Sequence, residues 1–307
     1  MSQSVHFIAI GGSAMHNLAI ALHQQGFDVT GSDDEIFEPS RSRLDRLGLM
    51  PDKLGWDPYR IHSGISAVIL GMHARLDNPE LQRAQELGIP VFSYPSYFYE
   101  RTKDKTRVVI GGSHGKTTIT SMIVHVLRHA GVEFDYLVGA QLEGFDCMVK
   151  VSDKSRVAII EGDEYLASAL DPVPKFHLYK PDIALISGIA WDHINVFKTF
   201  ESYVEQFRMF IDAIEPGGKL IYCLEDPEVR TLSEAKEVKA QRIPYGLPKH
   251  RIENGVTILE TGHGDVPWED SFRMMNTIGY TGPISVEWED AGMDRLVGAP
   301  EALAILP

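Results

Sequence analysis

The stretch 110-IGGSHGKTTITSM-122 runs from an apolar strand end through glycines into the start of an expected helix. Glycines let a backbone approach a polyphosphate closely, and the amide N–H groups at a helix start attract anions. In such a loop a lysine reaches the β- and γ-phosphates, and a threonine hydroxyl binds Mg²⁺. The full pattern G-x-x-x-x-G-K-[ST] is not met, because Ile110 stands at its first glycine position. We predict a phosphate site, with an ordinary strand–helix turn as the alternative, over Gly112, Ser113, His114, Gly115, Lys116, Thr117 and Thr118.

Polar residues follow the next two apolar runs along the chain. Glu161, Asp163 and Glu164 come after the run VAII, and the pair Asp192-His193 comes after DIALISGIA. The carboxyl ends of parallel strands share one edge of a sheet, so these side chains are aimed at the edge that carries the phosphate loop. Each cluster on its own is typical of a cap or a surface. Because three clusters converge in order, we predict that Glu161 and His193 act at the phosphate site.

The first part of the chain has a similar but weaker pattern. An apolar run, VHFIAI, leads to Gly11 and Gly12, apolar residues recur at helical spacing from Met15 to Leu22, and FDVTGSD follows as a second strand. This order predicts a strand–turn–helix–strand unit of a doubly wound α/β domain.

The turn of this unit, 9-AIGGSAM-15, departs from G-x-G-x-x-G because Ala9 and Ala14 stand at glycine positions. From the residues alone it is a dinucleotide site, as in an oxidoreductase, a site for another phosphate ligand, or a plain packing turn. Asp33 ends the second strand, where an acidic group can hold a ribose hydroxyl.

Strands alternate with helices twice along the chain, which predicts two parallel α/β domains. We expect a Rossmann-like domain over residues 1–105 and a second, phosphate-loop domain over 106–258, separated at the charged stretch ERTKDKTR. Residues 259–307 do not form a complete domain in this interpretation. From residue 260 onward they hold nine acidic and two basic residues, with elements expected only for a short helix and a strand.

Composition narrows the class of protein. The 307 residues carry a net charge of −14, which disfavours binding to nucleic acid or to anionic membranes. Two cysteines without metal-binding spacing disfavour a disulfide framework or a thiolate zinc site. No apolar run has the ~18 residues of a membrane span, and the N-terminus does not read as a signal peptide. We expect a soluble cytoplasmic protein, and the oligomeric state is left open.

Taken together, these motifs resemble those of the Mur ligases of bacterial cell-wall synthesis. The resembling pieces are VHFIAIGGSAM with TGSD, MHARLDNPEL, GGSHGKTT, IIEGDEY, KFHLYKPDIALISGIAWDHINVF and IPYG. The resemblance covers residues 5 to about 250. It implies an ADP-forming ligase in which ATP and Mg²⁺ convert the carboxylate of UDP-N-acetylmuramate to an acyl phosphate, which an amine then attacks. EGDEYLASALDPVPKFHLYKP is more similar to members that add the tripeptide L-Ala-γ-D-Glu-meso-diaminopimelate in peptidoglycan recycling, and addition of L-alanine is the alternative.

The resemblance also implies roles for individual residues. Lys116 resembles the phosphate-clamping lysine, Thr117 and Glu161 resemble magnesium ligands, and His193 resembles the histidine that holds a second magnesium ion. Lys116, Glu161 and His193 are thus the expected catalytic residues. The UDP-sugar is expected at Gly11, Gly12, Ser13, Met15, Ser32 and Asp33.

The chain departs from the family in three ways. Gly188 and Cys223 stand where asparagines are usual, and the second of these affects the expected adenine contacts. The third α/β domain of the family, which closes over ATP, is not recognisable after residue 250. Residues 262–306 instead resemble the last strand–helix unit of a sugar-isomerase-type TIM barrel, which we interpret as a join of unrelated sequences. The alternative is a divergent C-terminal extension that packs on the second domain. A UDP-sugar- and ATP-binding module without turnover is therefore the alternative function.

Overall fold

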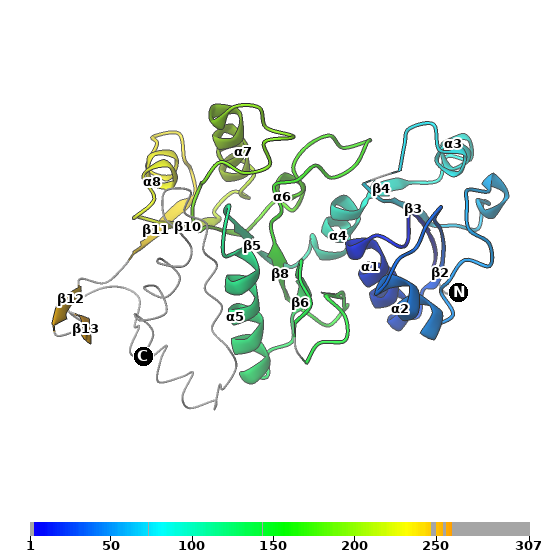
Figure 1. Ribbon diagram of the computed structural model, residues 1–307, viewed down its shortest axis with the longest axis horizontal. Helices are drawn as coiled ribbons and strands as arrows, with labels where there is room; N and C mark the ends of the chain where they lie inside the picture. Colours follow the sequence, from blue (N-terminus) through cyan, green and yellow to red (C-terminus); the bar gives the residue numbers. More distant parts are fainter. Residues whose placement is uncertain (1–2, 73, 143, 247–249, 254–255, 260–307) are drawn as a thin grey trace.

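The computed structural model describes residues 3–72, 74–142, 144–246, 250–253 and 256–259 (Figure 1). Within them the chain forms a four-stranded sheet, a seven-stranded sheet and one two-stranded hairpin. This confirms the predicted α/β class with two parallel sheets. The tail after residue 259, with its expected helix and strand, lies outside the described residues. No helix in the described ranges is long and apolar enough to cross a bilayer.

The first sheet has the strand order β2-β1-β3-β4, and all its neighbours run parallel. Its inner strand β1 is buried from Val5 to Ile8 and is apolar there except for His6, as expected for a parallel sheet covered by helices. The strands are β1 (Ser4–Ile8), β2 (Asp28–Ser32), β3 (Ala67–Leu70) and β4 (Val91–Ser93). The helices are α1 (Ser13–Gln24), α2 (Ser40–Arg46), α3 (Pro79–Glu86) and α4 (Tyr94–Thr102), with a 3₁₀ turn at Pro58–Arg60.

The second sheet has the order β11-β10-β9-β5-β8-β6-β7, and only the edge strand β7 is antiparallel. Helix α5 lies on one side of it, and α7 and α8 lie on the other (Figure 1). The strands are β5 (Thr106–Gly111), β6 (Asp135–Leu137), β7 (Val149–Lys150), β8 (Val157–Glu161), β9 (Ile183–Ile186), β10 (Lys219–Cys223) and β11 (Gln241–Tyr245), followed by the hairpin β12 (His250–Glu253) and β13 (Val256–Leu259). The helices are α5 (Lys116–His129), α6 (Lys175–Leu178), α7 (Phe200–Asp212) and α8 (Pro227–Ser233).

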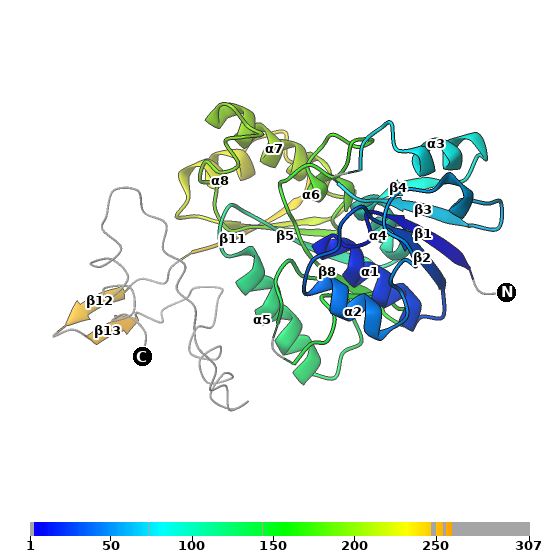
Figure 2. The same ribbon diagram turned by 45° about the vertical axis from the view of Figure 1, so that its right-hand side comes forward.

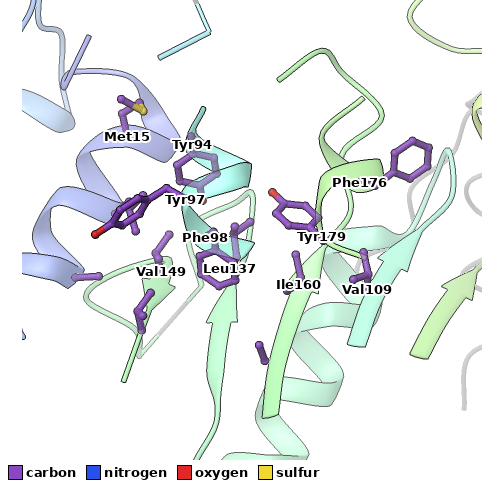
Figure 3. Packing of buried hydrophobic residues seen from close by; sticks show 14 of the residues in the cluster. Met15, Tyr94, Tyr97, Phe98, Val109, Leu137, Val149, Ile160, Phe176 and Tyr179 are labelled. Carbon is purple, nitrogen blue, oxygen red and sulfur yellow. The ribbon is translucent and has the colours of Figure 1, made fainter. Parts of the chain in front are cut away.

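One apolar core joins the two sheets. Helices α1 and α4 lie between the first sheet and strands β6 and β8 in both views (Figure 1 and Figure 2). Figure 3 shows the side chains that meet there, among them Met15, Tyr94, Phe98, Leu137, Ile160 and Tyr179. Because buried residues of both units pack into this single cluster, the carboxyl ends of β1 and β8 are held toward a common space. The division at residue 105 stays a prediction.

The structure corrects some local expectations. The apolar run PVFSY (90–94) predicts a strand throughout, but Tyr94 already begins α4, where the Ser93 hydroxyl accepts the Ser96 amide hydrogen at 3.4 Å. The charged stretch ERTKDKTR is divided between the end of α4 and the start of β5. On α5 the apolar spacing predicts one face made of Ile119, Met122, Ile123, Val126 and Leu127. Ile119, Ile123 and Leu127 pack against the core, whereas Met122 and Val126 are about half exposed, and Thr120 and Val124 are buried.

Candidate active site

The phosphate loop connects β5 to α5 and depends on two glycines. Gly112 has φ 132° and Gly115 has φ 76°, conformations that favour glycine. A Cβ atom on Gly112 would lie 2.1 Å from Ser187 Oγ, so the loop cannot carry a side chain there. Gly115 caps α5 without a side-chain hydrogen bond, which leaves the first amide N–H groups of α5 available to an anion.

The loop is anchored to the end of β9. Ser113 Oγ donates to the Ala190 carbonyl at 2.8 Å, accepts the Ala190 amide hydrogen at 2.8 Å, and lies 2.9 Å from the Tyr203 hydroxyl. Ser187 Oγ donates to the His114 carbonyl at 2.8 Å. The side chain of Ser113, one of the residues of the predicted phosphate site, is turned into the protein and supports the loop from its buried side.

Lys116 curls back over its own loop toward a buried carboxylate. Its Nζ donates to the Gly112 carbonyl at 2.7 Å and to Glu164 Oε1 at 2.9 Å. Glu164 Oε2 is equally close to Nζ at 2.9 Å, but its orientation does not give a hydrogen bond. The side chain of Glu164 has no exposed surface, and the Lys116 ammonium lies against both of its oxygens. A buried carboxylate is costly without such a cation beside it.

The predicted magnesium pair lies together at the start of α5. Thr117 Oγ1 donates to Glu161 Oε1 at 2.8 Å, and Glu161 Oε2 accepts the Gly139 amide hydrogen at 2.8 Å. Glu161 is the last residue of β8, and β8 pairs directly with β5. Adjacent parallel strands therefore place the carboxylate beside the helix that follows the phosphate loop. A hydroxyl and a carboxylate are donors that Mg²⁺ accepts.

His193 lies with a different set of carboxylates. One ligand atom each from Asp163, Glu164 and His193 falls within 4.8 Å of the others. His193 has φ 52°, and its amide donates to Asp192 Oδ1 at 2.6 Å, which fixes the turn after β9. The hydrogen bond with Glu164 raises the pKa of His193. Burial raises the pKa of Asp163, but the nearby ammonium of Lys175 more than offsets this and the pKa ends below its usual value.

The N-terminal turn opens onto the same space. A cavity of about 380 Å³ is lined by Gly12, Ser13 and Met15 from this turn and by Lys116 and Glu161 from the second sheet. The two predicted phosphate sites therefore face one cavity, between the two sheets.

Asp33 organises this N-terminal turn. Its Oδ2 accepts the Gly11 amide hydrogen at 2.7 Å, and a Cβ atom on Gly11 would lie 2.9 Å from that oxygen. Burial raises the pKa of Asp33 to about 6. Ala9 has φ 68°, so the position where the motif has its first glycine takes a glycine-like conformation despite its methyl group.

Two predicted residues have other surroundings. Ser32 is buried and its hydroxyl donates to the buried carboxylate of Glu80, which His6 also contacts at 3.3 Å. Ser32 is thus bound within the first sheet and does not line the cavity. Thr118 is exposed on the first turn of α5.

Four residues of the site were not singled out from the sequence: Ser187, Tyr203, Asp226 and Lys175. The Asp226 carboxylate accepts the Ile189 amide hydrogen at 2.8 Å and caps α8, so it fixes the loop that anchors Ser113. Only Asp226 carries a sequence signal, as an N-cap before Pro227. The contacts of the other three depend on distant segments.

Family models and known proteins match this architecture. The model of the Mur ligase family catalytic domain matches residues 4–106, and that of the Mur ligase middle domain matches residues 110–280. The chain is 34% identical to a UDP-N-acetylmuramate–L-alanine ligase from Mycolicibacterium gilvum (strain PYR-GCK), across 75% of this chain and 47% of that protein. It is 31% identical to the enzyme of the same name from Syntrophomonas wolfei, across 79% of this chain and 50% of that protein. The chain spans about half the length of these curated relatives.

Two solved structures share the fold. The UDP-N-acetylmuramate:L-alanyl-γ-D-glutamyl-meso-diaminopimelate ligase from Neisseria meningitides superposes with a TM-score of 0.72 at 22% identity, over 85% of each chain. The UDP-N-acetylmuramate–alanine ligase from Thermotoga maritima superposes with a TM-score of 0.62 at 21% identity, over 91% of this chain and 66% of that one. With a family model matching more than half of its residues, the chain belongs to the Mur ligase family.

Proposed function

We propose that this protein is an ATP-dependent ligase that joins the carboxylate of UDP-N-acetylmuramate to an amine, in peptidoglycan synthesis or recycling. The observation that carries the proposal is the shared cavity. Gly12 and Ser13 face it from one glycine turn, and Lys116 and Glu161 face it from the phosphate loop and the neighbouring strand. A reaction between a UDP-sugar and ATP needs such a meeting of two nucleotide sites.

The second sheet is the proposed ATP side. The free amide groups at the start of α5 bind phosphate oxygens, and Lys116 exchanges Glu164 for the β/γ-phosphates. ATP supplies the phosphoryl group that activates the carboxylate, and Mg²⁺ neutralises the phosphate charge. Thr117 and Glu161 fit one magnesium ion. Asp163, Glu164 and His193 fit a second, because one possible ligand atom of each lies within 4.8 Å of the others.

The first sheet is the proposed UDP-sugar side. The turn at Gly11, Gly12 and Ser13 starts α1, whose amide groups also have no side-chain cap, so a diphosphate can bind there. Asp33 holds the turn through Gly11 and orients its amides. The sugar then points toward Lys116 across the cavity. Because ATP and nucleotide sugars are cytoplasmic metabolites, the proposed reaction takes place in the cytoplasm.

Two amines are candidates for the second step. The sequence between Glu161 and Pro181 favours the tripeptide L-Ala-γ-D-Glu-meso-diaminopimelate. The names of the curated relatives favour L-alanine. The test is ADP release with UDP-N-acetylmuramate, Mg²⁺-ATP and either amine. Turnover with one amine names the substrate. Tight UDP-N-acetylmuramate binding without turnover for either amine assigns a binding module, and the absence of both binding and turnover overturns the proposal.

A further inference from the structure

A second lysine, Lys175, lines the cavity in addition to Lys116. Lys175 begins α6 and lines the cavity together with Lys116, and these are the two positively charged side chains among the described residues that line it. The Lys175 ammonium is ion-paired with Asp163 Oδ2 and lies 6.0 Å from the centre of the Tyr165 ring. An ammonium group has three donors, and Asp163 is its one hydrogen-bond partner within the described residues. Donors therefore remain for a ligand.

The backbone around Lys175 is fixed at both ends of a loop. Its amide donates to the Tyr165 carbonyl at 2.9 Å, and the next amide, of Phe176, donates to the Asp163 carbonyl at 3.1 Å. Phe176 itself is fully buried. Residues 163–176 thus close on themselves and hold the lysine in place, so little side-chain freedom is left to lose when a ligand binds.

Tyr94 provides an independent sign of a missing partner. It begins α4, only 5% of it is exposed, and its ring lines the same cavity. Its hydroxyl is buried and has no hydrogen-bond partner within the described residues. Nearly all buried polar groups are hydrogen-bonded, so an orphaned hydroxyl beside a cavity points to a ligand atom. Tyr94 comes from the first unit and Lys175 from the second, as the positions of α4 and α6 in Figure 3 illustrate.

The chemistry of the walls defines what these two donors bind. Met15, Leu137, Val138 and Val149 give the cavity an apolar side. A neutral hydroxyl donor and a cation next to an apolar surface suit a carboxylate carried on a short hydrocarbon group. A polyphosphate, with more negative charge than one carboxylate, is less suitable here because Asp163 is ion-paired with the same cation.

We propose that Lys175 and Tyr94 bind the carboxylate of the sugar-linked substrate and present it to the phosphate loop. This proposal rests on the proposed function, and it names the residues that bind the carboxylate of the substrate.

The test compares two ligands that differ in the carboxylate. UDP-N-acetylmuramate carries a lactyl carboxylate, and UDP-N-acetylglucosamine has the same nucleotide and sugar without it. We expect the intact chain to bind the first more tightly by calorimetry. In Lys175→Met this preference falls about 10- to 100-fold while affinity for UDP-N-acetylglucosamine stays within about twofold. Tyr94→Phe lowers the preference about 3- to 10-fold, and Lys175→Arg retains most of it.

The matched control is Lys150→Met. Lys150 is also ion-paired with a carboxylate, Glu133 at 3.1 Å, and also lies over a ring, Phe134 at 5.9 Å, but it does not line this cavity. We expect it to leave both affinities unchanged. Thermal unfolding of each variant reports any loss of fold.

The possible outcomes distinguish failure of this inference from failure of the proposed function. The inference is overturned if the folded Lys175→Met variant keeps the full preference, or if its affinity for both ligands falls equally. In either case the proposed function still stands. An intact chain that binds neither ligand overturns the proposed function itself.

Discussion

The ammonium of Lys116 lies 2.9 Å from both oxygens of Glu164, a carboxylate with no exposed surface. The pair lies at the start of α5, where the helix amides are free to bind an anion. When Lys116 binds phosphate, its ammonium must therefore move away from the buried Glu164 carboxylate, which then needs another cation beside it. Glu164 belongs to the cluster with Asp163 and His193, so the proposed nucleotide and metal sites would be coupled at this residue.

We expect Lys116→Ala to abolish ATP binding and to destabilise the fold. Removing one partner of a buried ion pair costs about 3–5 kcal/mol, because the other charge is left uncompensated. The double variant Lys116→Ala/Glu164→Gln separates the two effects. Chemical unfolding should show recovered stability, and calorimetry with ATP should still show no binding. Unchanged ATP affinity in the single variant would defeat the phosphate-loop assignment.

Loss of the Thr117–Glu161 pair should raise the Mg²⁺ concentration needed for ATP binding. Thr117→Val removes one oxygen ligand and leaves the side-chain volume nearly unchanged. We expect the half-saturating Mg²⁺ concentration to rise about tenfold or more, measured by titration at fixed ATP. The neighbouring Thr118→Val is the control, because Thr118 is exposed and makes no contact with Glu161. An equal rise in both variants would contradict the pairing.

Tyr203→Phe tests the support beneath the loop. The Tyr203 hydroxyl lies 2.9 Å from Ser113 Oγ and donates to Glu164 Oε1 at 3.1 Å, and the side chain is fully buried. Its removal should lower the free energy of unfolding by about 1–2 kcal/mol and weaken ATP binding several-fold. The Tyr136 hydroxyl donates to the Cys147 carbonyl at 3.0 Å. The control Tyr136→Phe should therefore lower the free energy of unfolding by a similar amount and leave ATP affinity unchanged. Loss of ATP affinity in both variants would indicate a general destabilisation of the fold.

Asp33 makes stability depend on pH. Its folded-state pKa of about 6 lies above the ordinary value of 3.8, so between these values the folded protein binds more protons than the unfolded chain. Its contribution to stability is therefore present at low pH and is lost as pH rises through about 6. In Asp33→Asn, urea unfolding should show greater stability at pH 7, on the order of 1–3 kcal/mol, and little difference near pH 4. A difference that is constant over this range would exclude titration of Asp33 as the cause.

Deletion of residues 260–307 should leave the affinity for UDP-N-acetylmuramate intact. The cavity residues that face the sugar side, Gly12, Ser13, Tyr94 and Lys175, all precede the deleted segment. Calorimetry on the shortened chain is the measurement, with circular dichroism to verify folding. A collapse in affinity would mean that the tail is needed for the sugar site.

The sequence was sufficient for the features that depend on neighbouring residues. Gly112 and Gly115, followed by Lys116 and Thr117, predict a strand–turn–helix, and the structure has this turn with positive φ at both glycines. Phosphate binding there stays a prediction. In NPELQRAQELG (78–88), Asn78 as an N-cap and Gly88 as a stop predict a helix, and the structure confirms both, since capping is a local interaction. The parallel order also placed Glu161 beside Thr117, because strands that alternate with helices leave their carboxyl ends on one edge.

Only the tertiary structure decided which distant side chains meet. On α5 the predicted face is confirmed for Ile119, Ile123 and Leu127, but Met122 and Val126 are exposed and Val124 is buried, because packing against the sheet sets the edges of the buried face. Tyr203 lies 90 residues from Ser113, and Tyr94 lies 81 residues from Lys175, separations at which sequence spacing carries no geometric information. By itself the sequence determined the α/β alternation and the phosphate loop, whose interactions are local. The orphaned hydroxyl of Tyr94 and the common cavity arise from packing one sheet against the other, whereas the ion pair of Lys116 with Glu164 joins the segments that follow the neighbouring strands β5 and β8. All three are properties of the folded chain.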